Sequence, residues 1–224
     1  MKLPISARLL ACCDYVAPGD RVADVGCDHG YLGIHLLQKG IASQVFAADI
    51  RPGPLEAALR NSKKYGVSAR MDCFLSNGVQ AVPRDFDCLV CAGMGADVMI
   101  SILGAAPWLR TPQYRLILQC QSKTPILRKY LSETGWRIHR ESVLRDGRFL
   151  YTVMEALWEP TGALTPGQCH ISPALLESGC RELPEYIRWV KEHLVLSVTS
   201  QKEHASPWER DALAELEQIK EENL

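Results

Sequence analysis

The chain has 224 residues, of which 47% are hydrophobic and 23% charged, and its formal net charge is −1. This composition is typical of a globular protein with one good-sized domain and room for a small appendage. No stretch of 18 consecutive apolar residues occurs, and no basic segment precedes an apolar run at the N-terminus. We therefore expect neither a membrane span nor a secretory signal.

The nine cysteines lie mostly in apolar runs, and their number is odd. Reduced thiols that act as small hydrophobic side chains fit this pattern, so we expect a cytoplasmic protein. Cys88 and Cys91 have the spacing of a metal-binding pair. Residues three apart in a strand point to opposite faces, however, so the pattern favours core cysteines and we predict no metal site.

Strand and helix signals alternate along the first 134 residues, after an opening helix predicted over residues 6–15. The alternation indicates a parallel sheet with helices on both faces. The predicted strands are 21–25, 44–48, 70–75, 86–91 and 115–119. The predicted helices between and after them are 31–39, 52–65, 96–103 and 125–134.

The alternation stops after residue 135. Two β-rich runs, 136–143 and 149–157, are joined across residues 145–147 with no room for a helix between them. They predict an antiparallel pair at the edge of the sheet. A parallel α/β sheet closed by such a pair is the Rossmann-like fold of the class I methyltransferases.

A Pro/Gly-rich break at residues 159–167 separates a predicted domain over 1–160 from a helical one over 168–224. Apolar residues in the second part recur with heptad spacing, and Pro184 is expected to kink or separate the first turn. A second helix begins at Ser206, so we predict an antiparallel two-helix coiled coil joined near His204. This hairpin either packs on the main domain or serves as a substrate arm or dimer contact. The seam residues are Leu176, Cys180, Leu183, Ile187, Val190 and Leu194.

The loop after the first strand carries the strongest functional signal. Asp24 ends that strand, and Gly26 and Gly30 allow the following loop to turn tightly. Asp28 stands where a dinucleotide-binding loop has a glycine that lets its backbone approach a pyrophosphate. A carboxylate repels phosphate but tolerates a cationic sulfonium. The loop therefore predicts S-adenosyl-L-methionine as the cofactor, not NAD.

Residues after the second and third strands complete the predicted cofactor site. Asp49, with Ile50 beside it, is placed to accept hydrogen bonds from both ribose hydroxyls. Asn77 and Gly78 are placed to meet the adenine of the cofactor. At the end of the first strand, Asp24 either holds the following loop in place or accepts a hydrogen bond from the amino group of the ligand.

Gly93, Met94 and Gly95 follow the fourth strand, where a substrate would meet the methyl group. They leave space for a bulky planar acceptor, and Gly93 also adjoins the cofactor. We name three catalytic candidates. Asp28 would form a polar wall beside the acceptor, and Tyr31 and Met94 would form a platform on which the planar acceptor lies. Asp28 beside His29 also suggests acid–base chemistry, but a histidine in a loop is more often a spacer.

Residues 110–148 contain nine basic residues and three acidic ones. Such a cluster either contacts a polyanion or is an ordinary charged surface.

Several of these motifs together resemble the bacterial tRNA (adenine-22-N1)-methyltransferases, the TrmK family. The resemblance extends over residues 1–157, and the two-helix tail is similar to the C-terminal coiled coil of that family. It implies a class I methyltransferase fold, S-adenosyl-L-methionine as donor, and N1 of an adenine in tRNA as acceptor. The motifs are Asp24-x-Gly26-x-Asp28-His29-x-Tyr31-Leu32, Gly53-Pro54-Leu55, Asn77-Gly78, Gly93-Met94-Gly95 and Leu116-Ile117-Leu118-Gln119.

Adenine N1 already has an in-plane lone pair, so the enzyme needs to supply alignment and a polar wall and not a strong base. Two alternatives remain open: a class I methyltransferase for a different acceptor, and a non-catalytic RNA-binding module on the same fold. We expect a tRNA-binding monomer or weak dimer that binds neither a membrane nor a metal.

Overall fold

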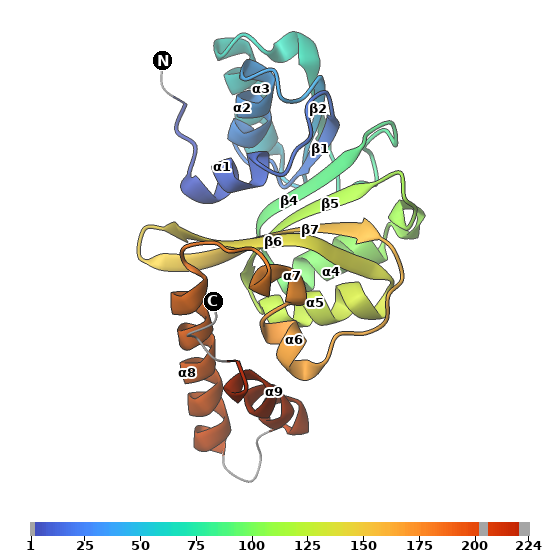
Figure 1. Cartoon of the computed structure of the whole chain (residues 1–224). Coiled ribbons are helices and arrows are strands. Elements are labelled where there is room, and N and C mark those ends of the chain that lie inside the picture. The colour runs from blue at the N-terminus through green and yellow to red at the C-terminus, as the bar shows by residue number, and fades with distance from the viewer. Residues whose placement is uncertain (1–2, 202–205, 220–224) are drawn as a thin grey trace.

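A computed structural model describes residues 3–201 and 206–219 (Figure 1). Seven strands form one sheet in the order β3-β2-β1-β4-β5-β7-β6. The first five pair in parallel, whereas β7 runs antiparallel to both β5 and β6. The strands are β1 (Arg21–Val25), β2 (Gln44–Asp49), β3 (Met71–Leu75), β4 (Cys88–Gly95), β5 (Arg115–Ser122), β6 (Trp136–Asp146) and β7 (Phe149–Trp158).

Helices cover both faces of the sheet and form a separate group near the C-terminus (Figure 1). The helices that precede the sheet or connect its strands are α1 (Ala7–Cys13), α2 (Tyr31–Gln38), α3 (Pro52–Lys64), α4 (Ala96–Gly104) and α5 (Thr124–Glu133). Those of the C-terminal segment are α6 (Pro166–His170), α7 (Pro173–Leu176), α8 (Leu183–Gln201) and α9 (Pro207–Glu217). Two short 3₁₀ turns, η1 (Ser68–Arg70) and η2 (Pro107–Leu109), precede β3 and β5.

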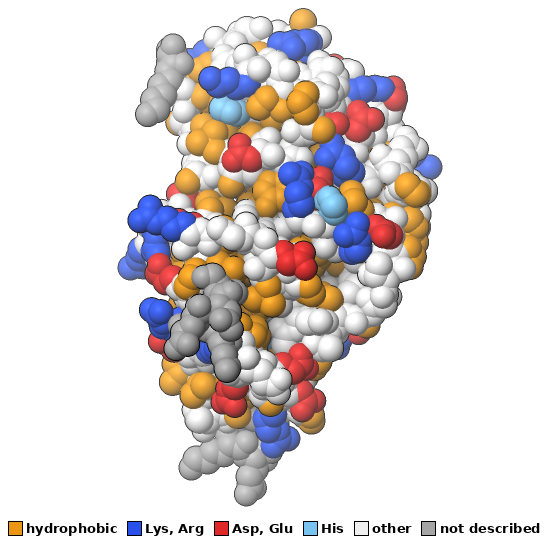
Figure 2. Space-filling view, in the orientation of Figure 1, with side chains coloured by type: hydrophobic (Ala, Val, Ile, Leu, Met, Phe, Trp, Pro, Cys, Tyr) orange, Lys and Arg blue, Asp and Glu red, His pale blue; other side chains and the backbone are white. Residues whose placement is uncertain are grey.

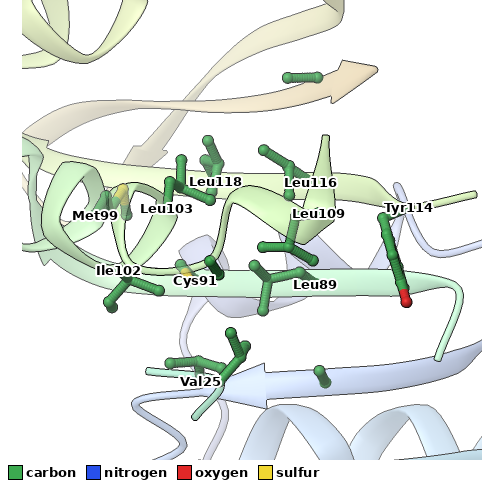
Figure 3. Close-up of a cluster of buried hydrophobic side chains, with 14 of the residues drawn as sticks. Val25, Leu89, Cys91, Met99, Ile102, Leu103, Leu109, Tyr114, Leu116 and Leu118 are labelled. Atoms are coloured by element: carbon green, nitrogen blue, oxygen red, sulfur yellow. The ribbon is translucent and has the colours of Figure 1, made fainter. Parts of the chain in front are cut away.

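Side chains of the central strands alternate between two apolar cores. Leu89 and Cys91 of β4 face α4 and α5, together with Val25 and Leu116 (Figure 3). Cys88 and Val90 face α1, α2 and α3 instead. The central strands are therefore apolar on both faces, as buried parallel strands require. The predicted class I methyltransferase fold is confirmed.

Several features differ from the sequence prediction, and β5 and β6 each run three residues further than expected, to Ser122 and Asp146. The fourth strand was expected to end at Cys91, but it continues to Gly95 with register shifts around Met94. In the C-terminal segment, Pro184 lies in the first turn of α8, and Leu176 belongs to the separate helix α7. The predicted kink or separation is therefore a separation of two helices.

The C-terminal helices pack on the sheet edge around a third apolar core that includes Val143 of β6. Helix α9 also lies close against α6, because a Cβ at Gly167 would come 2.6 Å from the Cβ of Glu215. The junction predicted near His204 lies outside the described residues. The domain boundary and the coiled coil remain predictions. None of the described helices is long and apolar enough to cross a membrane.

One buried ion pair joins the C-terminal segment to the sheet. Arg128 of α5 and Glu141 of β6 are both fully buried, with Nη2 2.7 Å from Oε1. The Nη1 group of Arg128 also donates to the carbonyls of Cys169 (3.0 Å) and His170 (2.6 Å). Ser172 donates its hydroxyl to Glu141. A single guanidinium therefore holds α5, β6 and the end of α6 together.

We predict that Arg128→Met lowers the free energy of unfolding by about 3–5 kcal/mol, because it leaves the Glu141 carboxylate buried and unpaired. Urea unfolding followed by circular dichroism measures the change. The matched control is Arg137→Met, since Arg137 forms an exposed pair with Glu159 and its loss costs about 0–1 kcal/mol. Equal midpoints for the two variants would contradict the role of the buried pair.

Candidate functional site

Two adjoining cavities lie at the carboxyl ends of β1, β2 and β4. The first, which we call the loop cavity, has a volume of about 410 Å³ and is lined by residues of the 26–28 loop and of α1. The second, the β3 cavity, has a volume of about 320 Å³ and lies toward β3 and α4. Together they form one cleft, because they share the lining residues Gly26, Asp49, Ile50, Met94 and Val98.

Most of the predicted site residues meet in this cleft. Asp24, Gly26, Asp28, Asp49, Ile50, Gly93 and Met94 line the loop cavity. Asn77 and Gly78 line the β3 cavity. The parallel strands explain the meeting, because their carboxyl ends lie at one edge of the sheet.

Two predicted residues, Gly30 and Tyr31, lie outside the linings of both cavities. Gly30 has a φ of +73°, and a Cβ there would come 2.7 Å from Cε of Met71 and 3.0 Å from Cβ of Ala58. This glycine therefore lets the start of α2 pack closely on its neighbours. Tyr31 is the first residue of α2, and its ring centroid lies 5.7 Å from that of His29.

Asp49 holds the loop in place. Its Oδ2 accepts the backbone N–H of Asp28 at 3.3 Å, and its Oδ1 accepts that of Arg51 at 2.9 Å. Asp28 has a left-handed φ of +50°, a conformation that aspartate tolerates better than most residues. Each oxygen of Asp49 keeps a second lone pair for a ligand. Positioning the loop and binding a hydroxyl are thus compatible in one carboxylate.

Asp24 is a buried acid without a full set of partners. Only 3% of the residue is exposed, and its Oδ2 has no hydrogen-bond partner among the described residues. Burial raises the pKa of Asp24 to about 7, and the nearby Asp49 adds to the rise, whereas the backbone N–H of Gly33 opposes it. A cationic group in the loop cavity would satisfy this oxygen. The site therefore fits a ligand with an ammonium group.

Asp28 is placed differently from the two buried acids. Its side chain is 62% exposed, and its Oδ2 lies 3.7 Å from Nε2 of His29. Asp28 lines the loop cavity, and its side chain is accessible to solvent.

Met94 covers the glycine of the loop. A Cβ at Gly26 would lie 2.1 Å from Cε of Met94, so any side chain at position 26 would displace the methionine. Gly93 has a φ of +79°, and its N–H donates to the buried amide oxygen of Gln119 at 3.0 Å. A side chain of the neighbouring strand β5 therefore fixes the irregular end of β4.

Sequence reasoning missed several residues of the cleft. Arg8 and Leu9 of α1, together with Arg51 and Val98, line the loop cavity. Arg8 also pairs with Asp146 in the turn between β6 and β7, with Nη1 3.3 Å from Oδ2. The packing of α1 near the β6–β7 hairpin brings Arg8 and Leu9 to the site, whereas Arg51 directly follows Ile50 and Val98 lies in the first turn of α4.

Most of the basic residues in 110–148 have structural partners. Arg128 is buried, and Arg115 bonds Asp20 and Glu155. Ion pairs also involve Lys123, Lys129, Arg137, Arg140 and Arg145. Arg110 and Arg148 form no ion pair within the described part of the chain. Figure 2 shows Lys and Arg side chains at the tip of the β6–β7 hairpin, where Arg148 lies over the ring of Phe149. The free basic surface is therefore smaller than the sequence suggests.

The described residues contain no group of three or more His, Cys, Asp or Glu side chains that could hold a metal ion. Cys88 and Cys91 lie in different apolar cores.

Comparisons with known proteins agree with this geometry. A model of the family described as "Methyltransferase domain" matches residues 5–154. The tRNA (adenine(22)-N(1))-methyltransferase of Bacillus subtilis is 29% identical over 156 residues, which cover 69% of this chain and 66% of that protein. A putative tRNA methyltransferase of Mycoplasma pneumoniae is 30% identical over 159 residues, covering 68% and 71%. The match thus spans about two thirds of the length of these relatives.

A solved structure from Streptococcus pneumoniae, a putative tRNA (m1A22) methyltransferase, superposes with a TM-score of 0.83 at 25% identity. The superposition covers 95% of this chain and 99% of that one, so the similarity includes the C-terminal helices. The predicted resemblance is confirmed.

We predict that Asp24→Asn stabilises the ligand-free protein at pH 8 by roughly 2–4 kcal/mol. A raised pKa in the folded state means that wild-type stability is lost as the pH rises from about 4 through about 7. The amide carries no charge, so the advantage of the variant should shrink as the pH falls from 8 toward 4. Thermal unfolding of both proteins between pH 4 and pH 8 measures this difference in stability. A lower melting temperature for Asp24→Asn at pH 8 would refute a desolvated carboxylate.

Proposed function

Because the chain belongs to the methyltransferase-domain family, we propose that it is an S-adenosyl-L-methionine-dependent enzyme that methylates N1 of adenine 22 in tRNA. The observation that carries the proposal is the buried Asp24, whose Oδ2 has no hydrogen-bond partner among the described residues, in a cleft at the carboxyl ends of the parallel strands. The acid at position 28 supports it, since it disfavours a pyrophosphate there. The Bacillus subtilis relative supports the choice of tRNA and of position 22.

We assign the donor site to residues on both sides of the cleft. Asp24 would accept a hydrogen bond from the amino group of the methionine moiety, and Asp49 would accept hydrogen bonds from the ribose hydroxyls. Asn77 and Gly78, with the apolar side chain of Ile50, would surround the adenine. Gly26 and Gly93 keep the backbone close to the ligand. When bound, the cofactor supplies an electrophilic methyl group on a sulfonium.

Asp28 and Met94 are our candidates on the acceptor side. The lone pair of adenine N1 lies in the ring plane, so no base is required to create the nucleophile. The exposed carboxylate of Asp28 would orient the base and stabilise the positive charge that the ring gains on methylation. Met94 would shape the floor beside Gly26. Tyr31 is assigned no contact with substrate, because it lies outside both cavities.

We further propose a cytoplasmic monomer or weak dimer in which the segment 168–224 helps to bind the RNA. Tyr186, Trp189 and His193 place a row of aromatic rings on α8.

We predict that Asp28→Asn lowers kcat for tRNA methylation by about 100-fold, the effect of removing one charge-stabilising group. Asparagine also tolerates the left-handed backbone, so the loop should keep its shape. Cofactor affinity measured by calorimetry should change less than about threefold. Asp14→Asn, at an exposed position at the end of α1, is the matched control. Turnover of Asp28→Asn equal to this control would exclude the proposed role.

The function itself is tested with isotope-labelled S-adenosyl-L-methionine and bacterial tRNA. We expect one methyl group per susceptible tRNA, mapped by mass spectrometry to N1 of adenine 22, and none in a transcript with guanine at that position. Absence of incorporation by a protein that binds the cofactor would overturn the proposal.

A further inference from the structure

A third cavity, of about 250 Å³, lies between the sheet and α8, and we call it the α8 cavity. The end of β5 and the start of α5 form one wall, including Gln121, Ser122 and Lys123. The start of β7 contributes Tyr151 and Thr152. The remaining walls come from His170 and from a face of α8. Of the roles assigned above, only the proposed RNA-binding surface on α8 borders this space.

The α8 cavity adjoins the cleft across the glycines of β4. Gln121 lines the cavity, and its Nε2 would lie 3.5 Å from a Cβ at Gly93, which lines the loop cavity. Ser122 is likewise 2.8 Å from a Cβ position at Gly95. The backbone of Gly93 and Gly95, which carries no side chains, thus lies between the two cavities. A molecule in the α8 cavity therefore lies on the opposite side of Gly93–Gly95 from the donor.

A surface ion pair also links the two spaces. Lys123 of the α8 cavity lies 2.7 Å, Nζ to Oδ2, from Asp97 of the β3 cavity. Both side chains are exposed, so this pair forms part of the shared rim.

The walls of the α8 cavity combine flat aromatic rings with a few polar groups. Trp189 is 46% exposed, and its ring lies 5.9 Å from that of Tyr186 in a stacked arrangement. The ring of His193 lies 4.1 Å from that of Trp189. Trp189 therefore offers aromatic surface that the fold does not bury.

Two buried polar atoms in these walls lack partners. Thr152 is only 2% exposed, and neither its hydroxyl nor Nε2 of His170 has a hydrogen-bond partner within the described residues. Burial and the nearby Arg128 lower the pKa of His170 to about 4, so its imidazole is neutral at pH 7. Neutral donors and acceptors around an apolar space suit a flat, uncharged ligand with a polar edge.

We propose that the α8 cavity receives the target nucleobase extruded from the RNA, with Trp189 as its stacking surface and Gln121 at its polar edge. The proposal rests on the proposed function. A base inside folded tRNA must leave its stack before its N1 can meet a methyl group, and enzymes that modify bases hold the extruded base against aromatic side chains. The α8 cavity offers such a surface beside the proposed methyl-transfer position.

The first test compares Trp189→Ala, Trp189→Phe and Leu196→Ala in tRNA methylation. Leu196 is exposed on α8 but does not line the cavity, so it is the matched control. We expect kcat/KM to fall by about 5- to 150-fold in Trp189→Ala, the range that base–aromatic stacking supplies. Trp189→Phe should retain most of the activity. Cofactor affinity should be unchanged in all three variants.

The second test uses a tRNA with 8-azidoadenosine at position 22. After irradiation with the wild-type protein, we expect the cross-link to map by mass spectrometry to α8 or to residues 120–124. A structural role for Trp189 would not place the base there, and this readout does not depend on whether Trp189→Ala folds.

Loss of activity in Trp189→Ala with partial rescue by phenylalanine, together with cross-links to these segments, supports the proposal. Wild-type kcat/KM in Trp189→Ala, or cross-links confined to other segments, overturns the proposed base-binding role of the α8 cavity. In either case, methylation of tRNA by the wild-type protein still upholds the proposed function. Absence of tRNA methylation by a cofactor-bound wild-type protein overturns both.

Discussion

The arrangement of the C-terminal half depends on the buried pair between Arg128 and Glu141. Removing two charges from water costs several kcal/mol per ion, and only a complete set of hydrogen bonds offsets that cost. Here the set is completed by the carbonyls of Cys169 and His170 and by the hydroxyl of Ser172. These bonds fix residues 169–172 against the sheet, and His170 lines the α8 cavity. The C-terminal segment is thus anchored to the sheet edge by buried polar contacts.

The alternation of strands and helices could be predicted from the sequence because it is a local property. Runs such as 21–25 and 44–49 are apolar on both faces, and glycine or proline marks most helix ends. The pairing of Arg128 could not be predicted. In the sequence it is one of nine basic residues in a charged stretch, and only the tertiary structure brings Glu141 and residues 169–172 around it.

The meeting of Asp24, Asp28 and Asp49 in one cavity could also be predicted, since they lie at or near the carboxyl ends of β1 and β2. Two predicted site residues, Gly30 and Tyr31, lie outside the linings of both cavities, and their roles remain predictions. Gly30 lies in the loop but supports the packing of α2, and Tyr31 begins that helix. Conversely, Arg8 and Trp189 lie far in sequence from the loop, and no spacing rule connects them to it. Long-range packing determines which side chains border a cleft, whereas short-range patterns determine where the cleft is.

The contacts of Arg128 also impose an order on folding. Its carbonyl acceptors lie 41 and 42 residues further along the chain, so they cannot form before those residues leave the ribosome. Until then, the guanidinium and the Glu141 carboxylate share a sheet edge that is still open to water. Docking of residues 169–172 then removes the pair from solvent. The residues that line the loop cavity and its neighbour all lie between positions 8 and 102, so they are synthesised before the helix α8 that closes the α8 cavity.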